Sequence, residues 1–288
     1  MQRIETIEEM QVLSESIRMA GHTVGLVPTM GFFHEGHLEL MRVARNYADT
    51  VVVSLFVNPA QFGEGEDLSA YPRDLDGDLA KAREVGVDCM FIPSAEDVYP
   101  EGCQTEVRVR RLTEHLCGLS RPGHFDGVTT VVAKLFHIVK PHLAVFGQKD
   151  YQQLAVISRM VRDLNMDIEI VGIPTVRDPD GLALSSRNSY LSLEERESAL
   201  SLSRALALAR DLVNRGERSA ATLRKAVEKE IRSRPFTRID YVSLCDPTTL
   251  EELVTIENEA LLALAVRVGR ARLIDNCILK SDEVEKSP

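Results

Sequence analysis

The stretch VGLVPTMGFFHEGHLELMRVA, residues 24–44, decides the fold, because an apolar run stops at Gly31 and apolar residues then return at a different spacing. The run has the branched, uninterrupted character of a strand buried on both faces of a sheet. Its apolar members are Val24, Leu26 and Val27. Apolar residues then recur every three to four positions, as on one face of a helix: Leu38, Met41, Ala44 and Tyr47. The stretch therefore predicts a strand, a turn and a helix that begins near His37.

The turn between this strand and this helix is suited to hold an anion. Gly31 and Gly36 let a ligand approach the backbone closely, and the first N–H groups of the helix carry the positive end of its dipole. His34 and His37 bring two imidazole rings to the same turn. Because the dipole disfavours an imidazolium there, we expect at least one ring to be neutral and to donate a single hydrogen bond.

Two other interpretations of the histidine pair stay open on the residues alone. A histidine near a turn is often a solvated side chain, and a pair of histidines is also a candidate zinc site. The zinc motif H-E-x-x-H, however, places both rings on one helical face with a glutamate base, whereas residues 34–37 read H-E-G-H. H-x-G-H directly after a strand is the signature of HIGH-type nucleotidyltransferases, which favours a nucleotide phosphate as the ligand.

The composition is that of a globular protein, with 288 residues, 44% of them hydrophobic and 27% charged, which is long enough for two moderate domains. A net charge of -10 and a pI near 5.3 argue against a basic surface for nucleic acid and favour small-molecule substrates. Neither a signal peptide nor a run of about 18 apolar residues is present, so no membrane association is expected. Five widely spaced cysteines predict reduced thiols in a cytoplasmic protein.

Strands and helices alternate through residue 173, which predicts an α/β fold with a doubly wound, Rossmann-like parallel sheet. The resemblance of H-x-G-H to the HIGH signature implies the HIGH nucleotidyltransferase type of this fold. The further expected strands span residues 51–57, 87–92, 143–146 and 168–173, with a short alternating segment at 106–110. The further expected helices span residues 6–20, 75–85, about 128–139 and the stretch after 147–150. The loop 60–71 leaves the carboxyl end of a strand, where parallel sheets bind ligands.

Beyond Pro174 the pattern changes, and it predicts a smaller α+β domain. A long helix opens at Ser192 with Glu195 as its capping partner, and a second helix spans 220–231. Three strands are expected at residues 238–244, 260–268 and 270–274. We therefore expect a nucleotide-binding domain over residues 1–175 and a second domain over residues 176–288.

Three separated segments are rich in cations or hydrogen-bond donors and point to one site: residues 30–37, 147–150 and 184–188. Their sequences are MGFFHEGH, GQKD and LSSRN. Together with VNPAQF (57–62), RPGHFDGVTTVV (121–132) and QKDYQQL (148–154), they closely resemble the pantothenate synthetase, or pantoate–β-alanine ligase, family. The resemblance covers residues 24–188 in motifs and extends more loosely beyond. H-x-G-H alone indicates only the superfamily, whereas these motifs in this order are specific as a set.

The resemblance implies a homodimeric ligase of coenzyme A biosynthesis that works in two steps. The carboxylate of pantoate attacks the α-phosphorus of MgATP to give pantoyl adenylate and pyrophosphate, and β-alanine then displaces AMP. Adenylation is needed because the oxygen of a free carboxylate is a poor leaving group. Since charge builds on phosphate oxygens, such an enzyme needs preorganised donors and no covalent nucleophile.

By the same resemblance, His37 donates a proton to the departing phosphate, and His34, Lys149 and Arg187 complete the catalytic set. Lys149 suits this role because its ammonium is a point charge on a flexible stem that follows the phosphates as they move. The implied ATP-binding set is Met30, Gly31, Phe32, Phe33, His34, Glu35, Gly36, His37, Gly147, Gln148, Lys149, Asp150, Val176, Leu184, Ser185, Ser186 and Arg187. Within it, Asp150 accepts from the ribose and the backbone of Val176 contacts adenine. Leu184 replaces the family's usual methionine, which keeps the backbone contact and leaves a side-chain role open.

Gln61 and Gln153 match the pantoate-binding positions, and Gln61 also adjoins β-alanine in the family. An amide offers a donor and an acceptor, which suits an acid with two hydroxyls. We expect the second domain and the loop 63–71 to close over ATP as a lid that excludes water. Arg121 and His124 are further candidates for lining this site.

A Mg²⁺ ion is expected with ATP, but its protein ligands stay unassigned. Asp74, Asp76 and Asp78 alternate in a way that admits a metal site. Acidic residues at a helix start more often match the helix dipole, and Mg²⁺ commonly rides on nucleotide phosphates with few protein ligands.

Two other functions compete with the ligase. The first is another HIGH-superfamily nucleotidyltransferase that acts on a phosphorylated acceptor. The second is a non-catalytic ATP-binding protein, which would bind ATP without forming AMP.

Overall fold

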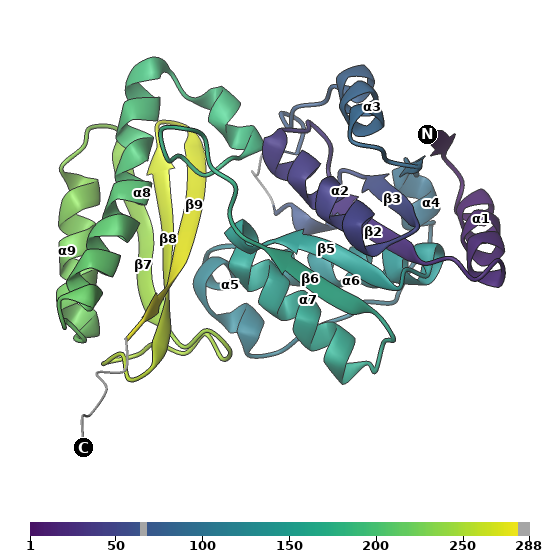
Figure 1. Cartoon of the computed structure of the whole chain (residues 1–288). Helices are drawn as coiled ribbons and strands as arrows, with labels where there is room; N and C mark the ends of the chain where they lie inside the picture. The colour runs from purple at the N-terminus through teal and green to yellow at the C-terminus, as the bar shows by residue number, and fades with distance from the viewer. Residues whose placement is uncertain (64–67, 282–288) are drawn as a thin grey trace. The chain divides into compact units, whose positions relative to one another are not determined.

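The computed structural model describes residues 1–63 and 68–281, and the chain forms two compact units (Figure 1). The first unit comprises Met1–Thr113, Gly118–Gln148 and Gln153–Thr175. The second comprises Glu114–Cys117, Lys149–Gln152 and the chain from Val176 onward. Each unit is built on its own sheet, because each has its own set of buried apolar strands.

The first unit contains a six-stranded parallel sheet of order β1-β4-β3-β2-β5-β6. Its strands are β1 (Gln2–Ile4), β2 (Val24–Thr29), β3 (Thr50–Leu55), β4 (Cys89–Phe91), β5 (Leu143–Gly147) and β6 (Glu169–Ile173). Side chains of β2 and β3 are buried on both faces, which is why these strands read as continuous apolar runs. The predicted doubly wound α/β fold is therefore confirmed.

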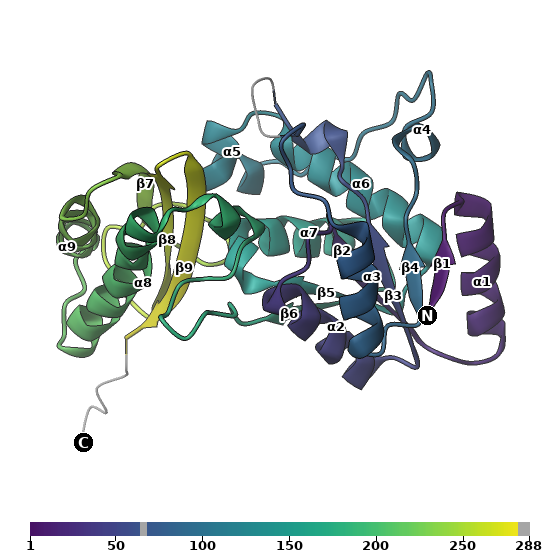
Figure 2. The same ribbon diagram turned by 90° about the horizontal axis from the view of Figure 1, so that it is seen from above.

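Helices cover both faces of this sheet. The helices are α1 (Ile7–Met19), α2 (Glu35–Tyr47), α3 (Leu75–Glu84), α4 (Ala95–Val98), α5 (Leu116–Ser120), α6 (His124–Val139) and α7 (Tyr151–Asp163). Right-handed crossovers place α2 and α3 on one face as the chain runs from β2 to β4. The chain then turns back to β5, so α6 lies on the opposite face (Figure 2).

The second unit is the predicted smaller α+β domain. Its antiparallel sheet has the order β7 (Thr237–Cys245), β8 (Glu259–Val268), β9 (Ala271–Lys280). The helices α8 (Leu193–Asn214) and α9 (Ala220–Arg232) cover one face of it and bury a continuous apolar core (Figure 1). Ser192 and Glu195 form the predicted capping box at the start of α8.

Two helix starts differ from the prediction. The helix α2 begins at Glu35 and not at His37, because His34 has the extended backbone of an N-cap residue. The helix α6 begins at His124, four residues before the predicted start, directly after Gly123 with its left-handed φ of 79°. In both cases the first helical turn contains glycine and histidine. Because neither residue contributes to an apolar stripe, the apolar spacing did not indicate that turn.

One predicted strand also differs, and the short alternating segment forms no strand. At 106–110 the Val107 backbone bonds instead to the hydroxyls of Thr129 and Thr130 on α6. The strand β9 continues to Lys280, beyond the predicted end at residue 274. The polar pair Asp275 and Asn276 interrupts its apolar pattern, but the ladder to β8 runs through both residues. The strand β1, which pairs with β4, was not predicted.

No disulfide joins the five cysteines, as predicted. Within residues 1–63 and 68–281, we find no helix with the length and apolar character needed to cross a membrane.

Candidate active site

The sheet order marks one place for a ligand in the first unit. From β2 the chain proceeds to β3 and β4 on one side, and β5 and β6 lie on the other side of β2. Open parallel sheets bind ligands beyond the carboxyl ends of the two strands where the order reverses. Here those strands are β2 and β5, which are paired through Gly25 and Leu143. The predicted segments 30–37 and 147–148 follow these two ends.

The turn after β2 has a left-handed backbone. Gly31 has a φ of 84° and Phe32 has a φ of 54°, a conformation that costs energy for a residue with a side chain. Thr29 steadies the start of the turn, because its hydroxyl donates to the Ser54 carbonyl at 2.7 Å and accepts from the Gly31 N–H at 3.3 Å. The strained residue therefore needs further partners downstream.

Asp78 on α3 supplies those partners. Its Oδ2 accepts from the Phe32 N–H at 2.7 Å and its Oδ1 accepts from the Phe33 N–H at 2.6 Å. Lys81, one turn further along α3, donates from Nζ to the Phe33 carbonyl at 2.7 Å. Successive N–H groups of such a turn form a concave anion site. Here the chain's own carboxylate occupies it.

The structure does not arrange Asp74, Asp76 and Asp78 as a three-carboxylate magnesium site. Asp78 is 1% exposed and both of its oxygens accept from the backbone. Asp74 caps α3 by accepting from the Gly77 N–H, and Asp76 is exposed. Across the described ranges 1–63 and 68–281, no group of three His, Cys, Asp or Glu side chains is arranged to hold a metal ion.

Burial raises the pKa of Asp78 above its ordinary value, and the bonds from Phe33 and Phe32 and the charge of Lys81 oppose that shift. A raised carboxyl pKa means that ionising this side chain costs stability in the fold. The contribution of Asp78 to stability is therefore greatest at low pH and declines as the pH rises through its raised pKa. The two N–H bonds offset part of the hydration that the carboxylate loses on burial.

The two histidines of the turn lie against each other. Their ring centroids are 4.1 Å apart with 28° between the ring planes. His37 occupies the third position of α2, and its Nδ1 accepts from the His34 N–H at 3.4 Å. In a neutral ring this assigns the proton to Nε2, which makes that atom the hydrogen-bond donor. The geometry supports the predicted single-donor imidazole.

Gln61 lies in a second cluster of the first unit, where its side chain is oriented by Asn58. The Asn58 amide donates to Gln61 Oε1 at 3.1 Å and to the Gly127 carbonyl at 3.1 Å. Gln61 Nε2 contacts Met30 Sδ at 3.1 Å. Asn58 is 1% exposed, so its polar side chain is kept buried for these bonds. Sequence analysis missed this residue, because Asn-Pro after a strand also marks an ordinary turn.

Arg121 and His124 hold the backbone of Gln61. His124 Nδ1 bonds to the Gln61 carbonyl at 2.8 Å, and Arg121 donates to the same oxygen at 3.3 Å. Arg121 and His124 also contact each other at 2.9 Å. The RPGHFDG loop therefore supports Gln61, beyond the lining role that the sequence suggests. Gln153, the other predicted pantoate residue, is half-buried in the first turn of α7.

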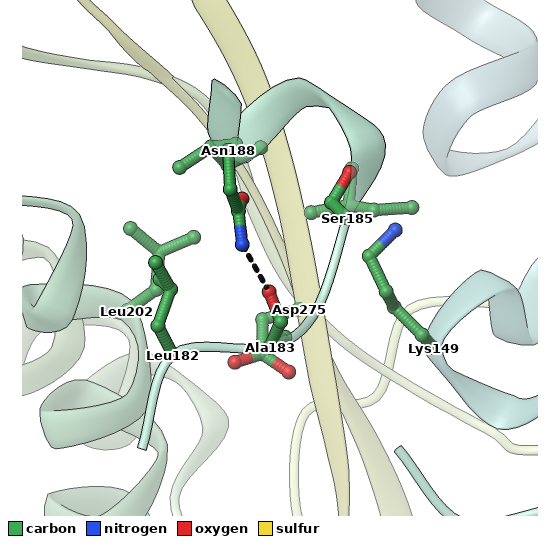
Figure 3. A pocket seen from close by; sticks show the side chains of 9 residues that line it. Lys149, Leu182, Ala183, Ser185, Asn188, Leu202 and Asp275 are labelled. Atoms are coloured by element: carbon green, nitrogen blue, oxygen red, sulfur yellow. Dashed lines mark hydrogen bonds between the residues drawn. The ribbon is translucent and has the colours of Figure 1, made fainter. Parts of the chain in front are cut away.

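The second unit contains the other two cationic segments. Lys149 and Ser185 line one hollow of roughly 240 Å³, open solvent included, together with Asn188 and Asp275 (Figure 3). The amino end of Lys149 is directed toward Ser185 (Figure 3). Ser185 starts a 3₁₀ turn, η4 (Ser186–Tyr190), by accepting from the Arg187 N–H at 3.3 Å. Lys149, from the GQKD segment, and the SSRN segment (residues 185–188) thus meet within this unit.

A hairpin over residues 176–184 leads into the SSRN segment. It begins at Val176, the residue predicted to contact adenine through its backbone. The Leu184 N–H donates to the Val176 carbonyl at 3.0 Å. Arg196 on α8 bonds to the hairpin's Asp178 and Asp180, each at 2.7 Å. Ser186 is buried and Arg187 is half-buried in η4. Asp150 lies 3.7 Å from the Lys149 ammonium, in reach of an ion pair.

The predicted catalytic set is divided between the two units. His34 and His37 belong to the first, and Lys149 and Arg187 belong to the second. Within each unit the predicted residues come together. Their meeting on a single triphosphate stays a prediction. The part of the expected closing loop at residues 64–67 lies outside the described residues.

Comparison with known proteins decides the family. The family model described as "Pantoate-beta-alanine ligase" matches residues 2–278 of this chain. The chain belongs to the pantoate–β-alanine ligase family. Pantothenate synthetase of Syntrophobacter fumaroxidans is 59% identical over 280 residues, which are 97% of this chain and 99% of that protein. The enzyme of Syntrophus aciditrophicus is 57% identical over 276 residues, 96% of each chain.

Solved structures of pantoate–β-alanine ligases agree with this assignment. Pantothenate synthetase of Thermus thermophilus superposes with a TM-score of 0.91 at 48% identity, over 96% of this chain and 99% of that one. The Francisella tularensis pantoate-beta-alanine ligase superposes with a TM-score of 0.80 at 33% identity, over 96% and 97%. That structure is described as a complex with "Beta-gamma ATP and Beta-alanine".

We expect Asp78→Asn to loosen the turn after β2. An amide accepts from only one of the two backbone N–H groups and faces the other with a donor, which leaves a buried N–H unpaired at a cost of about 1–3 kcal/mol. Urea denaturation should show that loss, and the amide resonances of Phe32 and Phe33 should shift. Asp76→Asn removes the same charge from the exposed side of α3. It should change neither the stability to urea nor the amide resonances of Phe32 and Phe33. Unaltered Phe32 and Phe33 amides in Asp78→Asn would contradict the assignment.

We also expect Gly127→Ala to destabilise the protein although alanine favours helices. An added Cβ would lie 2.3 Å from the Ala60 carbonyl oxygen and 2.7 Å from the Gln61 nitrogen, and backbone atoms cannot move aside cheaply. Overpacking costs about 1–3 kcal/mol, more than the roughly 0.5–1 kcal/mol that Gly→Ala gains in a helix. Thermal unfolding measures the net change in stability that results from these two opposing effects. Gly63→Ala, where no atom of residues 1–63 and 68–281 lies within 4 Å of the added Cβ, is the control.

Proposed function

We propose that this protein condenses pantoate with β-alanine in an ATP-dependent reaction that passes through pantoyl adenylate. The observation that carries the proposal is membership of the pantoate–β-alanine ligase family over nearly the whole chain. The histidine pair of the turn after β2 and the cations of the second unit support it. Both sets of groups suit a substrate with three phosphates.

In the first step a carboxylate oxygen of pantoate attacks the α-phosphorus of ATP. The bond from that phosphorus to the bridging oxygen breaks, and pyrophosphate leaves with the electron pair. In the second step the neutral amine of β-alanine attacks the acyl carbon. The bond to the AMP oxygen breaks, AMP leaves, and the nitrogen loses a proton to give the amide. Each step expels a stable phosphate anion, pyrophosphate in the first and AMP in the second.

The protein's part in this chemistry is placement and charge stabilisation. The neutral His37 donates from Nε2 to the departing phosphate, because its Nδ1 accepts from the His34 N–H. Lys149 and Arg187 neutralise the negative charge that moves onto pyrophosphate. Gln61, held by Asn58 and His124, binds pantoate, and Gln153 binds it from α7. The ATP phosphates would hold the Mg²⁺, which would offset part of their negative charge, and Asp78 would not ligate it because both of its oxygens accept from backbone N–H groups.

Other features that follow from the resemblance stay predictions. They are a homodimer, a cytoplasmic location, and closure of the segment 176–288 over ATP. Closure predicts that ATP with pantoate slows amide hydrogen exchange in the SSRN segment.

The defining experiment measures AMP formation from ATP with each substrate omitted in turn. We expect AMP and pantothenate to form in equal amounts only when pantoate and β-alanine are both present. A transferase for a phosphorylated acceptor would instead need a phosphate ester, and an ATP-binding protein would form no AMP. Either outcome would overturn the proposal.

We expect His37→Gln to lower kcat by roughly 10²- to 10³-fold, the usual cost of losing one donor to a developing charge. The Kd for ATP, measured by calorimetry, should change far less, because the donor acts mainly as charge develops. His22→Gln replaces an exposed histidine and serves as the matched control. Full turnover of His37→Gln at saturating substrates would remove His37 from the mechanism.

We expect Gln153→Ala to raise the KM for pantoate more than the KM for ATP. An amide that holds the hydroxyls of the acid contributes to pantoate binding and has no phosphate to contact. Initial rates at varied pantoate and at varied ATP separate the two constants. Equal increases would contradict the assignment.

A further inference from the structure

The strand β9 carries a buried ion pair at the side of the hollow that Lys149 and Ser185 line. Asp275 is 3% exposed, and both of its oxygens accept from Arg177, at 2.7 Å and 2.8 Å. Two parallel N–H to oxygen bonds make this the most directional kind of ion pair. The bond from Asp275 raises the pKa of the Arg177 guanidinium despite its partial burial, so Arg177 keeps its positive charge at every physiological pH.

Through Arg177 this ion pair anchors the hairpin that carries SSRN. Arg177 pairs with Ala183 in an isolated antiparallel bridge, and its guanidinium also donates to the Gly181 carbonyl at 3.1 Å. The chain then enters the SSRN motif through Leu184 and Ser185. A displacement of Arg177 would therefore be transmitted to Ser185 across a few residues of backbone.

The next residue of β9 holds the other motif. Asn276 Nδ2 donates to the main-chain carbonyl of Lys149 at 2.9 Å. Neighbouring residues of a strand point to opposite faces, so adjacent side chains reach two different segments. The Asn276 N–H also donates to Asp275 Oδ1 at 2.8 Å, which links the two anchors directly. The ladder from β9 to β8 continues on both sides of the pair, which gives it a rigid base.

We propose that Asp275 and Asn276 are positioning residues that set the Lys149 ammonium and the SSRN loop at the separation that a polyphosphate requires. The proposal deepens the proposed function, since it rests on phosphate binding by Lys149 and Ser185. Neither residue needs to touch ATP. Asn276 fixes the backbone from which the flexible Lys149 side chain starts, and Asp275 fixes the hairpin that presents the hydroxyls.

The ion pair also explains how a carboxylate is tolerated beside a phosphate site. Asp275 lines the same hollow as Lys149, and an unpaired carboxylate there would compete with phosphate for the ammonium. Arg177 pairs with that carboxylate through two bonds, so Asp275 does not compete for the Lys149 ammonium, which lies 3.7 Å from the carboxylate of Asp150.

The test uses two substitutions of Asn276 in the full chain, Asn276→Ala and Asn276→Leu. Both remove the donor to the Lys149 carbonyl, and leucine keeps the number and branching of the side-chain heavy atoms. Misplacing a reacting group by about 1 Å can cost up to ~10²-fold, so we expect kcat/KM for ATP to fall about 10- to 100-fold in both variants. The KM for pantoate should change by no more than about twofold, because its residues are not held by β9.

Ile278→Ala is the matched control. Ile278 lies two positions further along β9, on the same face as Asn276, and is half-buried. Its truncation removes packing and should lower the thermal unfolding temperature at least as much as Asn276→Leu does. It should leave kcat/KM for ATP unchanged. A merely structural role for Asn276 would instead make the loss of activity follow the loss of stability across the three variants.

The outcomes separate this inference from the proposed function. If the unaltered protein forms no AMP from ATP with pantoate and β-alanine, the proposed function fails, and the inference fails with it. If the unaltered protein is active and Asn276→Leu binds ATP with unchanged Kd and turns over at the same rate, only the inference is overturned. Equal increases in the KM for ATP and pantoate would also overturn it, because positioning of the phosphate groups affects ATP selectively.

Discussion

A left-handed turn bound to a buried carboxylate is the constraint on which the first half of the site depends. The N–H groups of Phe32 and Phe33 point to one side because the backbone at Gly31 and Phe32 is left-handed. Asp78 accepts both of them. Without that acceptor, two buried donors and a strained phenylalanine would be left uncompensated. This turn also determines where α2 begins, and therefore where His34 and His37 lie.

Polar side chains also hold expected substrate-binding residues in place elsewhere in the molecule. Asn58 orients Gln61, His124 holds the Gln61 carbonyl, and Asn276 holds the Lys149 carbonyl. In each case a buried or half-buried polar side chain bonds to a residue that is expected to meet the substrate. Reactions that rely on charge stabilisation need groups held in place before the substrate arrives, because reorganising dipoles during the reaction costs energy. A supporting layer of this kind is therefore a functional requirement of the chemistry.

Charge is distributed to match that chemistry although the protein is acidic overall. Several acidic side chains near the expected phosphates are already engaged with the protein itself. Asp78 is bound by backbone N–H groups and Asp275 by a guanidinium. Such engagement keeps each of these two carboxylates bound within its own unit. A net charge of -10 is thus compatible with a local site for ATP.

The sequence by itself determined the alternation of strands and helices, the change of architecture after Pro174 and the family. Buried parallel strands demand continuous apolar runs, and a set of ordered motifs leaves few alternatives. Only the tertiary structure decided the roles of Asp78, Asn58 and Asn276. Each bonds to a residue between 46 and 127 positions away, and no local periodicity records such a contact. The sequence could not tell an aspartate that binds a metal from one that binds two backbone N–H groups, because the residue type is the same and only the fold brings the partner.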